Sequence, residues 1–194
     1  MTMMKKTVVL VGDSIRMGYQ ATVREELVEL AWIRSAAENG GPSPRVVEHI
    51  DDWIVAHKPD VVHMNAGLHD IARERDADDC RVSLEQYEAN LRTLFSRLRA
   101  ETDAVLIWAT TTPVIEEKHN SVKPFDRLNA DIDAYNAAAV AIAAEYDVEI
   151  NDLNALVAGQ KADSDLMTPD GVHYTPKGSH LLGQVVASRI CPHL

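Results

Sequence analysis

The stretch TVVLVGDS, residues 7–14, is the part of the sequence that most clearly indicates the fold. Its first five residues form a continuous run rich in β-branched side chains, which is typical of a strand buried on both faces of a parallel sheet. Gly12, Asp13 and Ser14 follow at once, and a helical pattern begins soon after them. We therefore expect the chain to begin with a buried strand, a polar turn and a helix.

Short apolar runs and longer segments of helical periodicity alternate along the rest of the chain. Further strands are expected at residues 31–36, 60–64, 104–109 and 148–150, and helices at residues 17–30, 46–56, 84–98, 128–146 and 176–190. Ser83 is the expected N-cap of the third helix. This alternation predicts an α/β fold, with a parallel sheet that has helices on both faces. No repeat or linker divides the chain, so a single domain over residues 1–194 is expected.

Composition narrows the choice of partners and location. The chain has 194 residues, and its formal net charge of −11 should repel phosphate backbones and anionic membranes, so neither nucleic acid nor a membrane is an expected partner. No apolar stretch is long enough to cross a bilayer, and the run at residues 8–11 is too short for a signal peptide. Cys80 and Cys191 are expected to be free thiols, which favours a cytoplasmic location. The sequence does not predict the oligomeric state.

Ser14 lies where the first strand ends and the first helix begins. Its hydroxyl is then exposed at the edge of the sheet, beside N–H groups of a helix start that can stabilise an oxyanion. A serine hydroxyl needs a base before it becomes a nucleophile. Taken alone, the segment favours a simpler role, in which Ser14 caps the helix and Asp13 is a turn residue.

Asp170 and His173 lie three residues apart in a Pro- and Gly-containing turn before the last helix. A carboxylate in this position can accept the Nδ1 proton of the imidazole and turn Nε2 toward a serine. The segment alone is equally consistent with a surface loop. Combined with Gly-Asp-Ser after the first strand, Asp-x-x-His before the last helix is much more specific, because both segments are expected at the same edge of the sheet.

These two segments resemble the first and last sequence blocks of the SGNH/GDSL hydrolase family. The match comprises VGDSI at residues 11–15 and DGVH at residues 170–173. The resemblance implies that Ser14 is the nucleophile, His173 the general base and Asp170 the group that orients it. The order of elements matches over nearly the whole chain. The resemblance therefore implies a three-layer α/β/α sandwich around a five-stranded parallel sheet, a flavodoxin-like arrangement.

The second block of the family supplies a glycine whose N–H helps to form the oxyanion hole, together with the N–H of the nucleophile, here Ser14. The segment Asn39-Gly40-Gly41 lies in the corresponding place. The resemblance favours Gly41 in this role, with Gly40 as the alternative.

The third block departs from the family pattern Gly-x-Asn-Asp. When Gly67 and Asp70 are aligned with it, His69 occupies the position of the asparagine, whose amide donates to the oxyanion. A neutral imidazole has one N–H and can also donate. We favour His69 as the donor, and Asn65, earlier in the same turn, is the alternative.

A metal site is a competing interpretation, because several carboxylates and imidazoles are expected near one edge of the sheet. They are Asp13, His63, His69, Asp70, Asp170 and His173. These groups suit zinc or manganese, but no spacing such as HExxH is present and Ser14 would have no role. We therefore expect no metal and no organic cofactor, and we expect His63 to be a core or edge histidine.

Two further expectations concern parts of the chain outside these blocks. The charge-rich residues 73–81 are expected to form a solvated loop that directly follows the third block. The three tryptophans, Trp32, Trp53 and Trp108, are expected in the core.

The expected activity is that of a serine esterase acting on a small-molecule ester. No long apolar insertion is present that would enclose a fatty-acyl chain, and the chain has only two Phe residues. Both observations favour a short acyl group, such as acetyl on a carbohydrate or a small alcohol. The alternatives are a lysophospholipase or thioesterase acting on longer chains, and a non-catalytic module that binds acylated ligands, for which His69 would be the marker.

Overall fold

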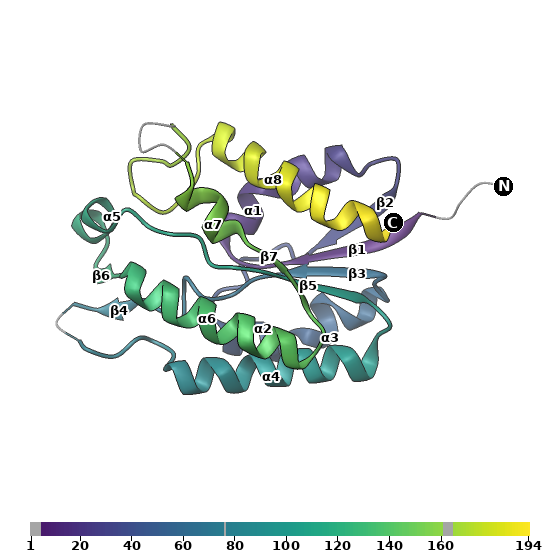
Figure 1. Ribbon diagram of the computed structural model, residues 1–194, viewed down its shortest axis with the longest axis horizontal. Coiled ribbons are helices and arrows are strands. Elements are labelled where there is room, and N and C mark those ends of the chain that lie inside the picture. The colour runs from purple at the N-terminus through teal and green to yellow at the C-terminus, as the bar shows by residue number, and fades with distance from the viewer. Residues whose placement is uncertain (1–4, 76, 161–164) are drawn as a thin grey trace.

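The computed structural model describes residues 5–75, 77–160 and 165–194. A five-stranded parallel sheet forms its centre, in the order β2-β1-β3-β5-β7 (Figure 1). The strands are β1 (Lys6–Val11), β2 (Ala31–Ser35), β3 (Val61–Met64), β5 (Val105–Ala109) and β7 (Glu149–Asn151). The expected parallel sheet is confirmed. Strand order reverses beside β1, since β2 lies on one side of it and β3 on the other, and ligands of such sheets bind outside this point.

Helices cover both faces of the sheet, which confirms the expected three layers. One face carries α1 (Ser14–Glu26), α7 (Leu153–Ala158) and α8 (Pro176–Ile190), and α1 packs against α8. The other carries α2 (Ser43–Glu48), α3 (Ile50–Trp53), α4 (Leu84–Glu101) and α6 (Asn129–Glu145). Two 3₁₀ turns, Val55–His57 and Cys191–His193, complete these layers, and α5 (Glu116–Val122) lies beyond the end of the sheet (Figure 1).

Capping and apolar periodicity explain where the helices lie. The Ser83 hydroxyl accepts the Gln86 N–H at 3.2 Å, so the expected N-cap of α4 is confirmed. The helix expected at residues 46–56 is instead divided among α2, α3 and the first 3₁₀ turn. It also begins earlier, at Ser43, because Pro44 occupies the first turn, where its missing N–H leaves no hydrogen bond unmade.

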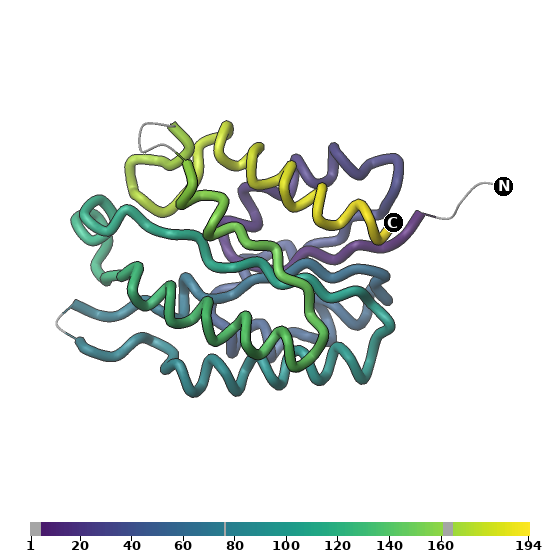
Figure 2. Tube along the Cα trace, in the orientation of Figure 1, coloured from purple at the N-terminus to yellow at the C-terminus, as the bar shows by residue number. Residues whose placement is uncertain are grey.

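A second, two-stranded sheet lies beyond the carboxyl ends of the main strands (Figures 1 and 2). In it, β4 (Arg73–Glu74) pairs antiparallel with β6 (Phe125–Asp126). The expectation of a solvated loop over residues 73–81 is therefore wrong for Arg73 and Glu74. Their partners lie about fifty residues further along the chain, so no local pattern marks this pairing.

The tryptophans differ in their surroundings. Trp108 is buried on the central sheet and Trp53 is half-buried, but Trp32 is 58% exposed. The expectation of a core position is wrong for Trp32, because β2 is an edge strand and this residue faces outward, with the Lys5 ammonium 5.1 Å from its ring centroid. Cys80 and Cys191 are free thiols, as expected.

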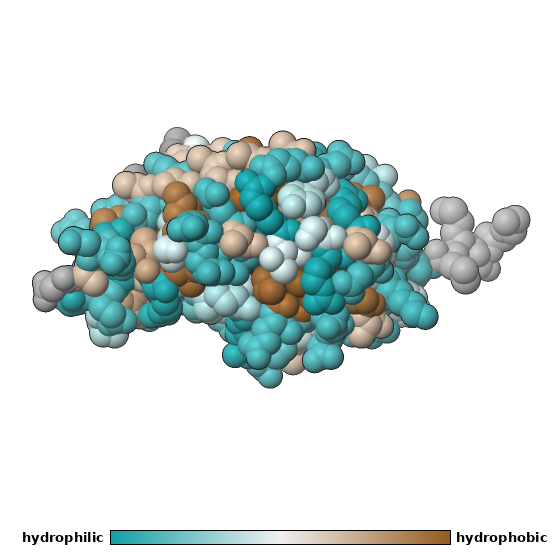
Figure 3. Space-filling view, turned by 90° about the horizontal axis from the view of Figure 1, so that it is seen from below, coloured by the Kyte–Doolittle hydropathy of each residue, from teal (hydrophilic) through white to brown (hydrophobic). Residues whose placement is uncertain are grey.

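The surface seen from the side of α4 is largely hydrophilic, with hydrophobic residues scattered among the polar ones (Figure 3). Within the described ranges, no helix combines the length and the apolar character needed to span a membrane.

Candidate active site

Ser14 is the first residue of α1 and follows β1 after a two-residue turn. The N-cap of this helix is Asp13, whose Oδ1 accepts the Ile15 N–H at 3.0 Å. The simpler interpretation, in which Ser14 is the cap, is therefore wrong. The Ser14 N–H has no hydrogen-bond acceptor within the described part of the chain, so both the hydroxyl and the N–H are available at the carboxyl edge of the sheet.

The structure brings Ser14, His173 and Asp170 into one hydrogen-bonded row. Ser14 Oγ lies 2.9 Å from His173 Nε2, and His173 Nδ1 lies 2.6 Å from Asp170 Oδ2. Burial by itself would raise the pKa of Asp170, but hydrogen bonds from Thr168 and from His173 outweigh it and hold that pKa below its usual range. Asp170 is thus a carboxylate at neutral pH, which keeps the imidazole oriented with Nε2 toward the serine.

The turn that holds Asp170 and His173 depends on Gly171. This glycine has φ +71°, and a Cβ there would lie 2.7 Å from the carbonyl oxygen of Ile115. The Gly171 carbonyl in turn accepts the Ile115 N–H at 2.8 Å, which ties the turn to the start of α5. A residue with a side chain would therefore strain the backbone and displace this segment.

The two glycines of the second block have different partners. The Gly40 N–H donates to the Gly12 carbonyl at 2.9 Å, which joins this loop to the turn before Ser14. The Gly41 N–H donates to Asn39 Oδ1 at 2.9 Å. The Asn39 side chain can rotate away, so the Gly41 N–H can donate to a ligand without breaking a backbone–backbone hydrogen bond. The Gly40 N–H cannot do so.

In the third block, His69 is half-buried, and its ring makes no hydrogen bond with any described residue. Burial lowers its pKa, and the positive charge of Arg127 adds to this effect, so the ring is neutral at neutral pH. The charge of Asp13 opposes this lowering of the pKa, and that of His173 adds to it.

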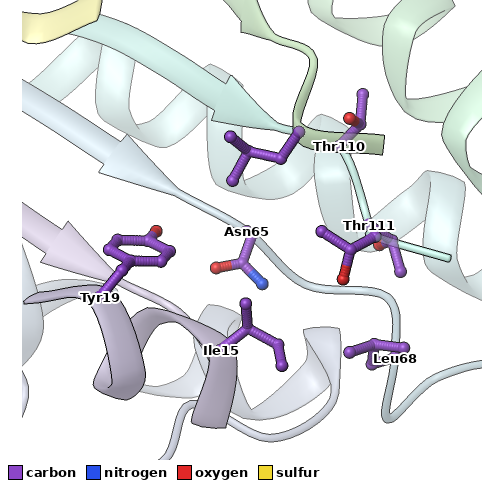
Figure 4. A pocket seen from close by; sticks show the side chains of 8 residues that line it. Ile15, Tyr19, Asn65, Leu68, Thr110 and Thr111 are labelled. Carbon is purple, nitrogen blue, oxygen red and sulfur yellow. The ribbon is translucent and has the colours of Figure 1, made fainter. Parts of the chain in front are cut away.

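Asn65 is buried, and its amide points into a small internal cavity (Figure 4). The space open to the centre of a water molecule is about 10 Å³, which is room for about one water. The cavity is lined by Ile15, Tyr19, Asn65, Leu68, Thr110, Thr111, Thr112 and Leu153. Asn65 Oδ1 has no partner within the described residues and lies so close to Gly12 that a Cβ there would come within 2.0 Å of it.

Three other polar side chains hold these loops together, and the sequence analysis assigned none of them this role. Asp70 is buried and accepts hydrogen bonds from Ser43, at the start of α2. Arg16 is also buried and donates to the carbonyls of Gly12 and Glu38, at 3.2 and 2.6 Å. The only feature of the sequence that could have singled out Arg16 is that a charged residue occupies the inward face of α1.

The candidate metal ligands do not gather into a site. His63 is buried in β3, where its ring contacts the Tyr19 hydroxyl at 3.4 Å and the Asn151 amide at 3.1 Å, so the expectation of a core histidine is confirmed. Burial lowers its pKa to about 3. Within the ranges that the structure describes, no three His, Cys, Asp or Glu side chains are arranged to hold a metal ion.

Comparison with known proteins points to one family. The model of the GDSL-like lipase/acylhydrolase family matches residues 10–181. No curated protein matches the sequence significantly.

Solved structures share the fold at low sequence identity. A lipase/acylhydrolase from Enterococcus faecalis has a TM-score of 0.82 at 20% identity, with 97% of each chain covered. The acetyl xylan esterase AlAXEase has a TM-score of 0.77 at 19% identity, covering 95% of this chain and 99% of its own. The acetylxylan esterase Axe2 from Geobacillus stearothermophilus has a TM-score of 0.74 at 23% identity, covering 98% and 96%.

Proposed function

Because this chain belongs to the GDSL-like lipase/acylhydrolase family and is a serine hydrolase that acts on ester bonds, we propose that Ser14, His173 and Asp170 are its catalytic triad. We further propose that it removes short acyl groups, chiefly acetyl, from carbohydrates or small alcohols. The observation that carries the triad is the row of hydrogen bonds, 2.9 Å from Ser14 Oγ to His173 Nε2 and 2.6 Å from His173 Nδ1 to Asp170.

The mechanism is acyl transfer in two steps. His173 Nε2 takes the hydroxyl proton of Ser14 while Oγ attacks the ester carbonyl, and the resulting imidazolium is stabilised by the Asp170 carboxylate. His173 then gives this proton to the departing alcohol oxygen, which leaves an acyl-enzyme on Ser14. A water molecule, deprotonated by the same nitrogen, attacks the acyl-enzyme and releases the acid and the free serine.

Three N–H groups stabilise the oxyanion in this proposal. The Ser14 N–H has no protein acceptor within the described residues, and the Gly41 N–H becomes available when the Asn39 side chain rotates away. The third donor is the neutral His69 ring, whose pKa responds to the charges of Asp13 and His173 and which has no competing partner among the described residues. Asn65 is a poorer candidate because its amide is enclosed in the internal cavity of Figure 4.

Two observations support a short acyl group. The chain has no long apolar insertion that would enclose a fatty-acyl chain, and it has only two Phe residues. Two of the proteins with similar folds are acetyl xylan esterases. Wild-type turnover of p-nitrophenyl esters should therefore fall steeply from acetyl to octanoyl. Faster turnover of the octanoyl ester would favour the lysophospholipase or thioesterase alternative instead.

The triad is tested by hydrolysis of p-nitrophenyl acetate by wild type, Ser14→Ala and the matched control Ser96→Ala, an exposed serine on α4. Removing the nucleophile should lower kcat by about 10⁴-fold to 10⁶-fold, while the control keeps wild-type activity. Equal activity in Ser14→Ala and wild type would rule out Ser14 as the nucleophile. A folded wild type that binds acetylated ligands but hydrolyses no ester would favour the non-catalytic module.

A further inference from the structure

A buried arginine lies beside the third block. Arg127 follows β6 and is only 5% exposed, and its Nε donates to the Leu68 carbonyl at 2.6 Å. Leu68 directly precedes His69, so the guanidinium is held against the loop that carries the proposed oxyanion donor. The sheet formed by β4 and β6 holds this segment beyond the carboxyl ends of the main strands (Figure 1).

The guanidinium of Arg127 has no carboxylate partner among the described residues. Within the same ranges, its only side-chain hydrogen bond is the one to Leu68, whereas the equally buried Arg16 donates to Gly12, Gln20 and Glu38. Asp13 and Asp170 attract Arg127 electrostatically without hydrogen-bonding to it. A buried charge without a counterion is unfavourable, and burial accordingly lowers the pKa of Arg127 to about 10, although it stays charged at neutral pH.

The guanidinium of Arg127 keeps unused hydrogen-bond donors. Its Nη atoms have no hydrogen-bond partner among the described residues, and the residue as a whole is 5% exposed.

A second arginine lies on the same aromatic ring. The guanidinium carbons of Arg127 and Arg81 are 5.0 and 5.6 Å from the ring centroid of Phe125. Arg81 is exposed, and its one ion pair within the described part of the chain, with Glu74, is long at 3.8 Å. Both arginines also act on His69, whose pKa is lowered first by burial and then by their charges. Arg81, Phe125 and Arg127 therefore form a local cationic cluster, which Arg127 holds against the loop that carries His69, on a chain whose net charge is −11.

We propose that this cationic cluster binds a carboxylate carried by the alcohol half of the ester, as in an acetylated hydroxy acid or uronic acid. This inference rests on the proposed esterase function of Ser14. A guanidinium forms two parallel hydrogen bonds with a carboxylate, and such a ligand would supply the counterion that Arg127 lacks. The carboxylate is assigned to the alcohol half because the acyl group proposed above is acetyl, which carries no charge.

The test compares two acetyl esters of similar size, 4-acetoxybenzoate and the neutral 4-acetoxybenzamide. Wild type should hydrolyse the carboxylate with a kcat/KM about 10-fold to 100-fold higher, mainly through a lower KM, and added NaCl should reduce this ratio. Arg127→Met and the exposed Arg81→Met should each lower the ratio toward one. Arg92→Met, which removes a partly exposed arginine paired with Glu145 on α6, should keep the wild-type ratio.

Each outcome has a distinct meaning. Equal rates for both esters in wild type, or a preference that survives in Arg81→Met and Arg127→Met, would overturn the proposal. A carboxylate preference seen only with the mono-p-nitrophenyl ester of succinic acid, where the charge is on the acyl half, would also overturn it. Hydrolysis of neither ester, or hydrolysis that persists in Ser14→Ala, would instead mean that the proposed function itself has failed.

Discussion

Asp70 and Ser43 join the loop after β3 to the loop after β2. The Ser43 hydroxyl donates to Asp70 Oδ1 at 2.5 Å, and the Ser43 N–H lies 2.9 Å from the same oxygen. The Ser43 oxygen also accepts from the Asn90 amide on α4 at 2.9 Å. These buried contacts join the segment that carries Gly41 to the segment that carries His69. The two segments follow β2 and β3, the strands on either side of β1, which leads to Ser14.

Asp70→Ala should therefore destabilise the protein as well as reduce its activity. The Ser43 N–H would remain buried without an acceptor, which costs about 1–3 kcal/mol. Urea denaturation measures the free energy of unfolding, and Asp103→Ala, at an exposed position, serves as control with an expected change within about 0.5 kcal/mol. An unchanged unfolding midpoint in Asp70→Ala would show that the contact does not stabilise the fold.

His69→Ala should lower kcat by about 100-fold to 1000-fold, the usual effect of losing one oxyanion donor. His69→Asn restores an amide donor and should recover much of this loss. Burial, together with Arg127, lowers the pKa of His69, so its ring is neutral at neutral pH and the variants are compared there. A wild-type kcat in His69→Ala would exclude the ring as a donor.

Arg16→Met should disturb the two loops that its guanidinium joins. The carbonyls of Gly12 and Glu38 would lose a charged donor, so a loss of at least about 2 kcal/mol is expected. Arg16→Lys should also be destabilising, because one ammonium cannot replace both Nη2, which donates to the two carbonyls, and Nη1, which donates to Gln20. Thermal stability and kcat should fall together in both variants. Full stability of Arg16→Met would show that the two loops do not depend on this side chain.

His119→Phe should make the protein less sensitive to acid. His119 is buried on α5, and neither ring nitrogen has a partner among the described residues. Burial, reinforced by Arg127 and Lys123 and opposed by Asp170 and Asp126, lowers its pKa to about 4. In the unfolded chain His119 takes up a proton below its ordinary pKa of about 6.5, whereas in the folded chain it does so only near pH 4. Wild-type stability therefore falls as the pH drops from about 6.5 toward 4.

The measurement is the difference in Tm between His119→Phe and wild type across this pH range. It should grow in favour of the variant as the pH falls. His57→Asn, at an exposed histidine, should follow the wild type at every pH. A Tm difference that does not change with pH would show that His119 takes no part in the acid response.

Much of the fold could be predicted because its signals are local. The run at residues 7–11 and the apolar periodicity of α4, α6 and α8 depend on residues close together in sequence, and each became the expected element. The spacing of Asp170 and His173 likewise predicted a contact within one turn, observed at 2.6 Å. Trp32 was wrongly expected in the core. The burial of a residue on an edge strand depends on whether another element covers that strand, and the type of residue does not indicate this.

Local patterns in the sequence predicted the five strands of the main sheet, the position of Ser14 after the first strand, and the short-range pairing of Asp170 with His173. They did not predict α5 and α7, the pairing of β4 with β6, the contact of Asp70 with Ser43, or the burial of Arg127 against Leu68 without a counterion among the described residues. The physical reason is that strand pairing and burial arise from contacts between residues far apart along the chain. Polar residues in such contacts show no local periodicity that would distinguish them from those exposed to solvent.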